Sequence, residues 1–131
     1  MALHPLCFSL ALQGYKDALA FASVGQTTGN NFPTDVTFHP DALARMSSDC
    51  GEFICVNASY ILGKHDAVRV DLMTCWELAG YDFALTRQRS GAGFLDGDWH
   101  PSVASKLFEA ACAYNELYLY TDATGLIRIQ N

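Results

Sequence analysis

An alternation of side chains before a glycine-rich stretch is the feature that most constrains how this chain can fold. Over residues 81–88 large side chains alternate with small or polar ones, and a period of two predicts a β-strand. Ser90-Gly91 supplies a turn, residues 92–95 supply a partner strand, and Asp96-Gly97-Asp98 supplies a second turn. The sequence therefore predicts a β-hairpin over Tyr81–Asp98.

Helical periodicity is found on both sides of this predicted hairpin. Apolar residues from Phe8 to Leu19 form one helical stripe, and a second predicted helix begins at Pro40 and extends to about Asn57. Gly14 and Gly51 weaken these two helices, because glycine is a poor helix former. A third helix is predicted from Asp66 to Ala79, ended by Gly80, and a fourth begins at Pro101.

Two short strands are predicted at the end of the sequence. They cover residues 116–120 and 126–129, with a turn at Asp122–Gly125 between them. The predicted fold is therefore α+β: three N-terminal helices, then a β-hairpin, a helix and a second β-hairpin. The strands would form a small antiparallel sheet covered on one face by helices, within a single domain over residues 1–131.

The charge of the chain excludes one class of function. Fourteen acidic residues stand against eight basic ones, and the net charge is −6. A groove for DNA or RNA needs basic residues clustered on one face, and the sequence has no such cluster, so direct nucleic-acid binding is not expected. An acidic surface favours a partner with a basic surface, including proteins that normally hold nucleic acid.

Compartment and membrane association follow from the cysteines and the apolar stretches. Five cysteines occur without the spacing of a disulfide framework, which predicts structural thiols in a reducing cytoplasm. The longest apolar-leaning stretch, Ala2–Leu12, is too short to span a bilayer. A secretory signal ending near Ala18–Ala20 is the alternative, although no basic residue precedes its apolar part.

The region from Arg87 to His100 contains the residues that could carry chemistry. Arg87 and Arg89, beside two glycines, could hold a phosphate or carboxylate at the tip of the predicted hairpin. Asp96 and Asp98 could belong to the same binding site, or they could coordinate a metal together with His100. Asp-Gly-Asp is also an ordinary turn sequence. We predict no catalytic residue, no metal and no cofactor. A non-enzymatic role is favoured, although paired carboxylates leave catalysis open.

Several segments resemble a group of small, mostly uncharacterised proteins of tailed bacteriophages and prophages. The group carries an AGHDF-x-LTR-N-x-x-GAGF-x-D-type segment, which is similar to Leu78–Arg87 and Gly91–Asp96 here. Residues 40–43, 49–53 and 116–122 resemble further parts of the group, and they occur in the same order along the chain. This chain differs from the group in having Tyr81 in place of histidine. The resemblance implies a phage origin.

Acidity, size and this resemblance together predict a phage-type accessory protein that binds a host protein. It would inhibit a host defence system, as anti-CRISPR and antirestriction proteins do, in the cytoplasm of a bacterial host. The alternative is a small enzyme or an anion- or metal-binding module centred on residues 87–100. A virion or scaffolding component is a third possibility. The sequence does not indicate the oligomeric state.

Overall fold

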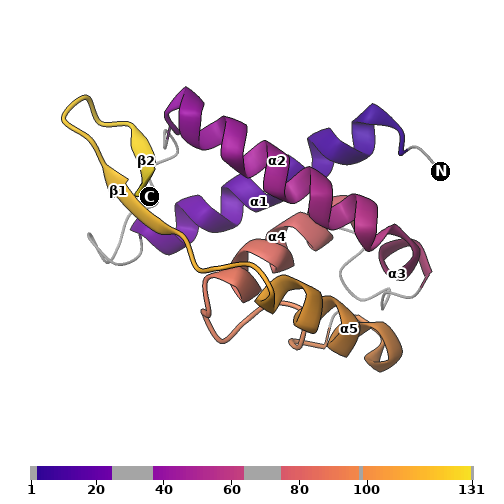
Figure 1. The fold of residues 1–131 in the computed structure, drawn as a ribbon. Coiled ribbons are helices and arrows are strands. Elements are labelled where there is room, and N and C mark those ends of the chain that lie inside the picture. The colour runs from indigo at the N-terminus through magenta and orange to yellow at the C-terminus, as the bar shows by residue number, and fades with distance from the viewer. Residues whose placement is uncertain (1–2, 25–36, 64–74, 98, 131) are drawn as a thin grey trace.

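Five helices and one antiparallel strand pair make up the part of the chain that the computed structural model describes, residues 3–24, 37–63, 75–97 and 99–130. The α+β class is confirmed (Figure 1). In chain order the elements are α1 (Pro5–Val24), α2 (Pro40–Val56), α3 (Ala58–Gly63), α4 (Cys75–Arg87), α5 (Pro101–Cys112), β1 (Tyr118–Thr121) and β2 (Ile127–Gln130). None of the described helices is long and apolar enough to cross a membrane.

Three of the helices begin at the same dipeptide, His-Pro. In each, the histidine Nδ1 accepts a hydrogen bond from the backbone N–H two residues later, at 3.0 Å for His4, 3.1 Å for His39 and 3.1 Å for His100. The histidine thus satisfies an amide that has no partner within its helix. Proline fits the first helical position because its missing N–H is not needed there. Local sequence therefore determines where α1, α2 and α5 start.

The segment predicted as the first strand is a helix. Tyr81–Arg87 forms the second half of α4, and Gly80 lies inside this helix rather than at its end. The described residues from Gln88 to Gly97 form turns and bends, so the predicted Tyr81–Asp98 hairpin is wrong. Nine residues of α4 are buried, and a helix buried on nearly all sides has no polar face to reveal its period. The predicted third helix lies outside the described residues up to position 74.

Helices α1 and α4 cross with their backbones in contact. A Cβ atom added at Gly14 of α1 would lie 2.1 Å from the carbonyl oxygen of Glu77. A Cβ atom added at Gly80 of α4 would lie 1.9 Å from the carbonyl oxygen of Ala11. Only glycine allows so close an approach. The two glycines that weaken these helices in isolation are therefore what joins them.

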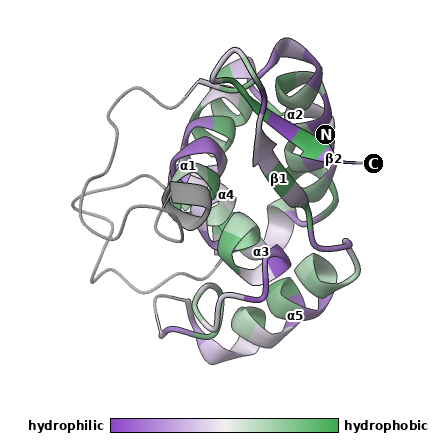
Figure 2. Ribbon diagram, turned by 90° about the vertical axis from the view of Figure 1, so that its left-hand side faces the viewer, coloured by the Kyte–Doolittle hydropathy of each residue, from purple (hydrophilic) through white to green (hydrophobic). Residues whose placement is uncertain are grey.

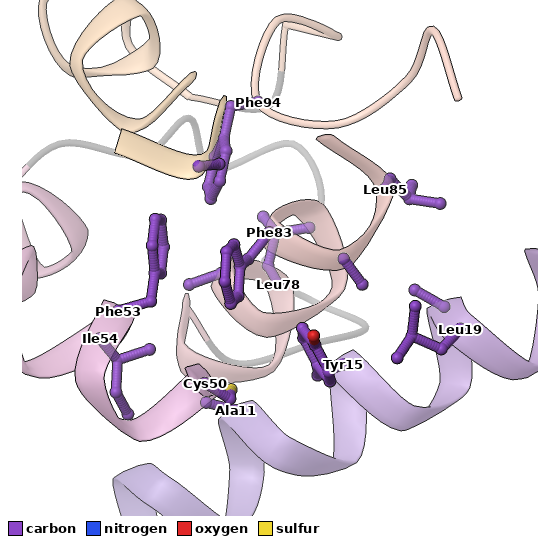
Figure 3. Packing of buried hydrophobic residues seen from close by; sticks show 14 of the residues in the cluster. Ala11, Tyr15, Leu19, Cys50, Phe53, Ile54, Leu78, Phe83, Leu85 and Phe94 are labelled. Atoms are coloured by element: carbon purple, nitrogen blue, oxygen red, sulfur yellow. The ribbon is translucent and has the colours of Figure 1, made fainter. Parts of the chain in front are cut away.

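The core is a cluster of aromatic rings between α1, α2, α4 and the segment that follows α4 (Figure 3). The rings of Phe53 and Phe83 stack with centroids 4.1 Å apart and an angle of 4° between their planes. Phe94 lies 5.7 Å from Phe53, and Trp99 meets Phe94 edge-on. Phe94 and Trp99 follow α4 in sequence, so the chain after this helix folds back onto the core.

The C-terminal hairpin is confirmed, with its strands shifted by one or two residues from the predicted positions. Tyr118 pairs with Gln130 and Thr121 with Ile127 in an uninterrupted antiparallel register. On its other side β2 meets the residues before α2, because Ile127 N–H donates to Thr37 and His39 N–H donates to Ile127. The hairpin consequently lies beside the start of α2, in front of the helices in the view of Figure 2.

Candidate functional site

Arg87, the last residue of α4, lies inside the protein and not at an exposed tip. Its side chain is 2% exposed. Nη1 donates to Asp49 Oδ2 at 2.8 Å and to the Tyr15 hydroxyl at 3.0 Å, and Nε donates to the carbonyl of Asn115 at 2.7 Å. One guanidinium group therefore joins α1, α2 and the segment after α5. These contacts give Arg87 a structural role, since its side chain connects three parts of the fold.

The surroundings of Arg87 favour uncharged phenol and thiol groups. Burial raises the pKa of Tyr15 to about 12, and the nearby guanidinium only partly offsets it. Burial also raises the pKa of Cys50 to about 12, and the charge of Asp49 adds to the effect. The pKa of Tyr114 is raised by burial and by the hydrogen bond that its hydroxyl donates to Glu52. A thiol with a raised pKa is a poor nucleophile at neutral pH.

Arg89 holds the ends of two helices. Its backbone has a φ of 57°, and the N–H groups of Arg89 and Ser90 bond back to Thr86 and Leu85 in the pattern of a Schellman motif. Its Nη2 donates to the carbonyl oxygens of Cys112 at 3.2 Å and Tyr114 at 3.3 Å. A cation placed at carbonyl groups of a helix C-terminus is stabilising.

The predicted acidic and histidine ligands have separate local partners. Asp96 is exposed, and its carboxylate accepts from the backbone N–H of Gly93 at 3.2 Å. His100 caps α5, whereas Asp98 lies outside the described residues. Arg87, Asp96 and His100 thus have different hydrogen-bond partners, and these bonds do not bring the three side chains together in one site. Among the described residues, no three histidine, cysteine or acidic side chains form a group that could hold a metal.

Two buried polar side chains of α4 organise the segment after it, and sequence reasoning missed both roles. Asp82 accepts from the indole N–H of Trp99 at 2.7 Å. The Thr86 hydroxyl accepts from the backbone N–H of Phe94 at 3.2 Å, and a Cβ atom at Gly93 would lie 2.2 Å from that hydroxyl. The Leu78–Arg87 and Gly91–Asp96 segments therefore fit together as one packing unit.

A pocket of about 270 Å³ lies between the start of α2 and the C-terminal hairpin. Arg45 of α2 and Arg128 of β2 contribute cations to its wall, and His39 and Tyr120 also line it. Both arginines have acidic neighbours: Arg128 Nε lies 2.7 Å from Asp122, and Arg45 Nε lies 3.9 Å from Asp49. The charge of Arg128 is therefore balanced by Asp122, whereas Arg45 shares Asp49 with Arg87, and Asp41 adds an acidic group to the pocket wall.

The outer face of the C-terminal hairpin exposes two tyrosines. Tyr118 is 66% exposed and Tyr120 is 46% exposed, whereas Leu119 between them packs against the core. On the neighbouring strand the same face carries Gln130 and Arg128, which pair with the two tyrosines. We call the side chains of Tyr118 and Tyr120 the tyrosine face. Exposed aromatic rings that are side by side are a common component of protein interfaces.

Comparison with known proteins finds no matching family model, no matching curated protein and no matching solved structure.

Proposed function

We propose that this chain is a phage-type accessory protein that acts by binding a protein of the bacterial host. Its action would be that of a non-catalytic inhibitor of a defence system, of the anti-CRISPR or antirestriction kind, in the host cytoplasm. The tyrosine face is the observation that carries the proposal. The phage assignment rests on the sequence resemblance of Leu78–Arg87 and the segments around it.

The tyrosine face has the composition of an interface centre. Tyrosine combines a large apolar ring with a polar hydroxyl, and it is enriched among the residues that dominate binding energy. Tyr118 and Tyr120 lie on a regular strand whose position is set by β2 and by the start of α2. The backbone that carries the two rings is therefore positioned before a partner arrives, which lowers the entropic cost of binding.

The charge of the chain favours a basic partner surface. The net charge is −6, and the side chain of Glu116, two residues before β1, is exposed. Proteins that bind nucleic acid present clustered lysine and arginine, so an acidic protein with exposed aromatic rings can occupy such a surface. This reasoning supports a protein of the host nucleic-acid machinery as the target.

The contacts of the arginines favour binding over chemistry. Arg87 and Arg89 both make hydrogen bonds within the chain, and Arg87 is enclosed by its partners. A phosphate or carboxylate substrate would have to displace these bonds. The alternative of an enzyme or an anion-binding module at residues 87–100 therefore gains no support from the described geometry.

Affinity capture from phage-infected host cells, followed by mass spectrometry, tests the proposal. We expect the unaltered protein to retain one host protein in a stoichiometric amount, and the Tyr118→Ala/Tyr120→Ala variant to lose it. Tyr60→Ala is the matched control, because Tyr60 is also exposed, at 37%, but lies on α3. Recovery of no stoichiometric partner, or equal recovery by the double variant, would contradict the proposal.

A further inference from the structure

We infer that the outer edge of β1 binds an extended basic segment of the partner protein as an added β-strand. The inference rests on the proposed function and specifies how the partner is held. Main-chain hydrogen bonds to the edge of β1 would supply part of the affinity, and the side chains next to that edge would select a basic sequence.

The direction of the backbone groups in β1 follows from the hydrogen bonds around the hairpin. Asp122 N–H donates to Leu126 inside the hairpin, whereas Ile127, the partner of Thr121, directs its N–H and carbonyl to the opposite side. Thr121 and Ile127 are therefore a non-hydrogen-bonded pair, and the pattern alternates along an antiparallel ladder. The N–H and carbonyl groups of Leu119 and Thr121 consequently point away from β2.

These outward groups have no partner among the described residues. The strand pair of β1 and β2 is the whole sheet there, and no further backbone or side-chain bond to Leu119 or Thr121 is present within it. Natural edge strands are usually protected by lysine, proline, a bulge or a covering element. Residues 118–121 contain neither lysine nor proline, and their register has no bulge. Gln88 closes this row at Leu117, because its side-chain amide donates to the carbonyl of Leu117 and accepts from its N–H. Within the described residues, the groups of Leu119 and Thr121 are therefore the part of the edge that can accept an added strand.

The side chains around this edge favour arginine or lysine in the added strand. Tyr118 and Tyr120 would be the nearest neighbours on the outer face, and a cation over a tyrosine ring is attracted by it. Glu116 is exposed two residues before β1. The positive charge of Arg128 lies one strand further away and is paired with Asp122 at 2.7 Å. The tyrosine rings of β1 and the carboxylate of Glu116 are thus the groups that would attract a basic segment.

Fluorescence anisotropy with a labelled peptide of alternating arginine and threonine tests the inference on the full chain. Thr121→Pro removes one outward N–H and leaves the bonds to β2 intact, because proline is tolerated on an edge strand. Thr121→Val is the matched control, since it retains the N–H. We expect Thr121→Pro to weaken binding about tenfold or more, and Thr121→Val to change it by less than about twofold.

Two altered peptides make the result independent of how the proline variant folds. Methylation of every second peptide nitrogen blocks main-chain pairing without changing the charge, and we expect it to abolish binding. Replacing arginine by glutamate should do the same through charge. Equal binding of the methylated peptide would show that attraction is purely electrostatic and would overturn the inference. So would no binding of the arginine peptide, or binding only of a second copy of this chain.

Capture from infected cells separates this inference from the proposed function. If Thr121→Pro remains folded and still retains the host partner that the tyrosine variant loses, the protein binds a host protein but not by strand addition. If neither the unaltered protein nor any variant retains a partner, the proposed function itself fails. The thermal unfolding curve of each variant is the control for folding in both cases.

Discussion

At the scale of single residues, Arg87 contributes most to the connections between distant parts of the chain. Its guanidinium group bonds to Tyr15, Asp49 and Asn115, and its central carbon lies 5.2 Å from the ring centre of Tyr114. A planar group with five donors can satisfy several acceptors at once, which lysine cannot reproduce. Loss of this side chain would leave a carboxylate, a hydroxyl and a carbonyl without their donor.

We expect Arg87→Ala to lower the free energy of unfolding by about 3 kcal/mol, because it removes the donor of three hydrogen bonds, to the Tyr15 hydroxyl, the Asp49 carboxylate and a backbone carbonyl. Arg45→Ala is the control. It removes an exposed arginine that approaches the same Asp49 at 3.9 Å, and it should cost less than about 1 kcal/mol. Urea unfolding measures both values. A loss below about 1 kcal/mol for Arg87→Ala would contradict the structural role.

At the scale of elements, the crossing of α1 and α4 depends on the absence of two side chains. The atoms nearest to a Cβ at Gly14 or Gly80 belong to the backbone of the opposite helix. Side-chain rotation therefore cannot relieve the contact, and the helices would have to move apart. Gly51 of α2 differs, because a Cβ there would lie 3.5 Å from the Phe8 ring, an ordinary contact distance.

Gly14→Ala and Gly80→Ala should each destabilise the protein by about 3 kcal/mol or more, since overpacking against backbone has no cheap relaxation. Gly51→Ala should leave the stability unchanged or raise it by up to about 1 kcal/mol, because alanine favours a helix more than glycine does. Thermal unfolding followed by circular dichroism ranks the three variants. Equal effects at the three positions would show that α1 and α4 do not cross in this way.

The elements that the sequence predicts correctly are those with a local signal. α2 and α5 have apolar stripes and His-Pro starts, and the C-terminal hairpin has a turn in which Asp122 and Gly125 take part. α4 has no such signal, because its neighbours bury nearly all of its surface. The alternation of side chains that predicts a strand has another origin. Phe83 and Leu85 are buried in the core, whereas Asp82 and Thr86 bond to the segment after α4.

The candidate site was harder to predict, because its properties depend on contacts between distant residues. Arg87 and Arg89 resembled exposed binding residues, yet their partners lie on other helices far away in sequence. The glycines near them resembled turn residues, whereas Gly93 is needed for its closeness to Thr86. The aromatic C-terminal strand was visible in the sequence. The sequence does not indicate which side of the hairpin faces the helices, and that orientation decides which rings are exposed.

At the scale of the whole molecule, the groups around Arg87 determine how stability depends on alkaline pH. Tyr15, Cys50 and Tyr114 all have raised pKa values, and burial is the main cause in each case. A group whose pKa is higher in the folded state stabilises the fold below its unfolded pKa. That stability is lost as the pH rises through the folded pKa.

We expect the free energy of unfolding to fall between about pH 9 and pH 12. In this range the Cys50 thiol and then the tyrosine hydroxyls ionise in the unfolded chain, while Cys50 and Tyr15 stay neutral in the folded protein. One pH unit above the unfolded value, Tyr15 alone should account for about 1 kcal/mol of the loss. Tyr15→Phe should make the decline shallower by that amount, at the expense of the hydrogen bond from Arg87. Urea unfolding at several alkaline pH values measures the slopes. Equal slopes for the two proteins would contradict the burial of the Tyr15 hydroxyl.

The contact of α1 with α4 also limits how this sequence can diverge. At Gly14 and Gly80 a backbone atom of the opposite helix occupies the space of a side chain. At Gly93 the Thr86 hydroxyl occupies that space, and a φ of 123° also favours glycine, so all three glycines should persist in any descendant that keeps the fold. Exposed positions such as Tyr118 are free of that restriction and can change with each new partner. Distant relatives should therefore be recognisable by three glycines and the Asp49–Arg87 pair, even where the binding surface has lost all resemblance.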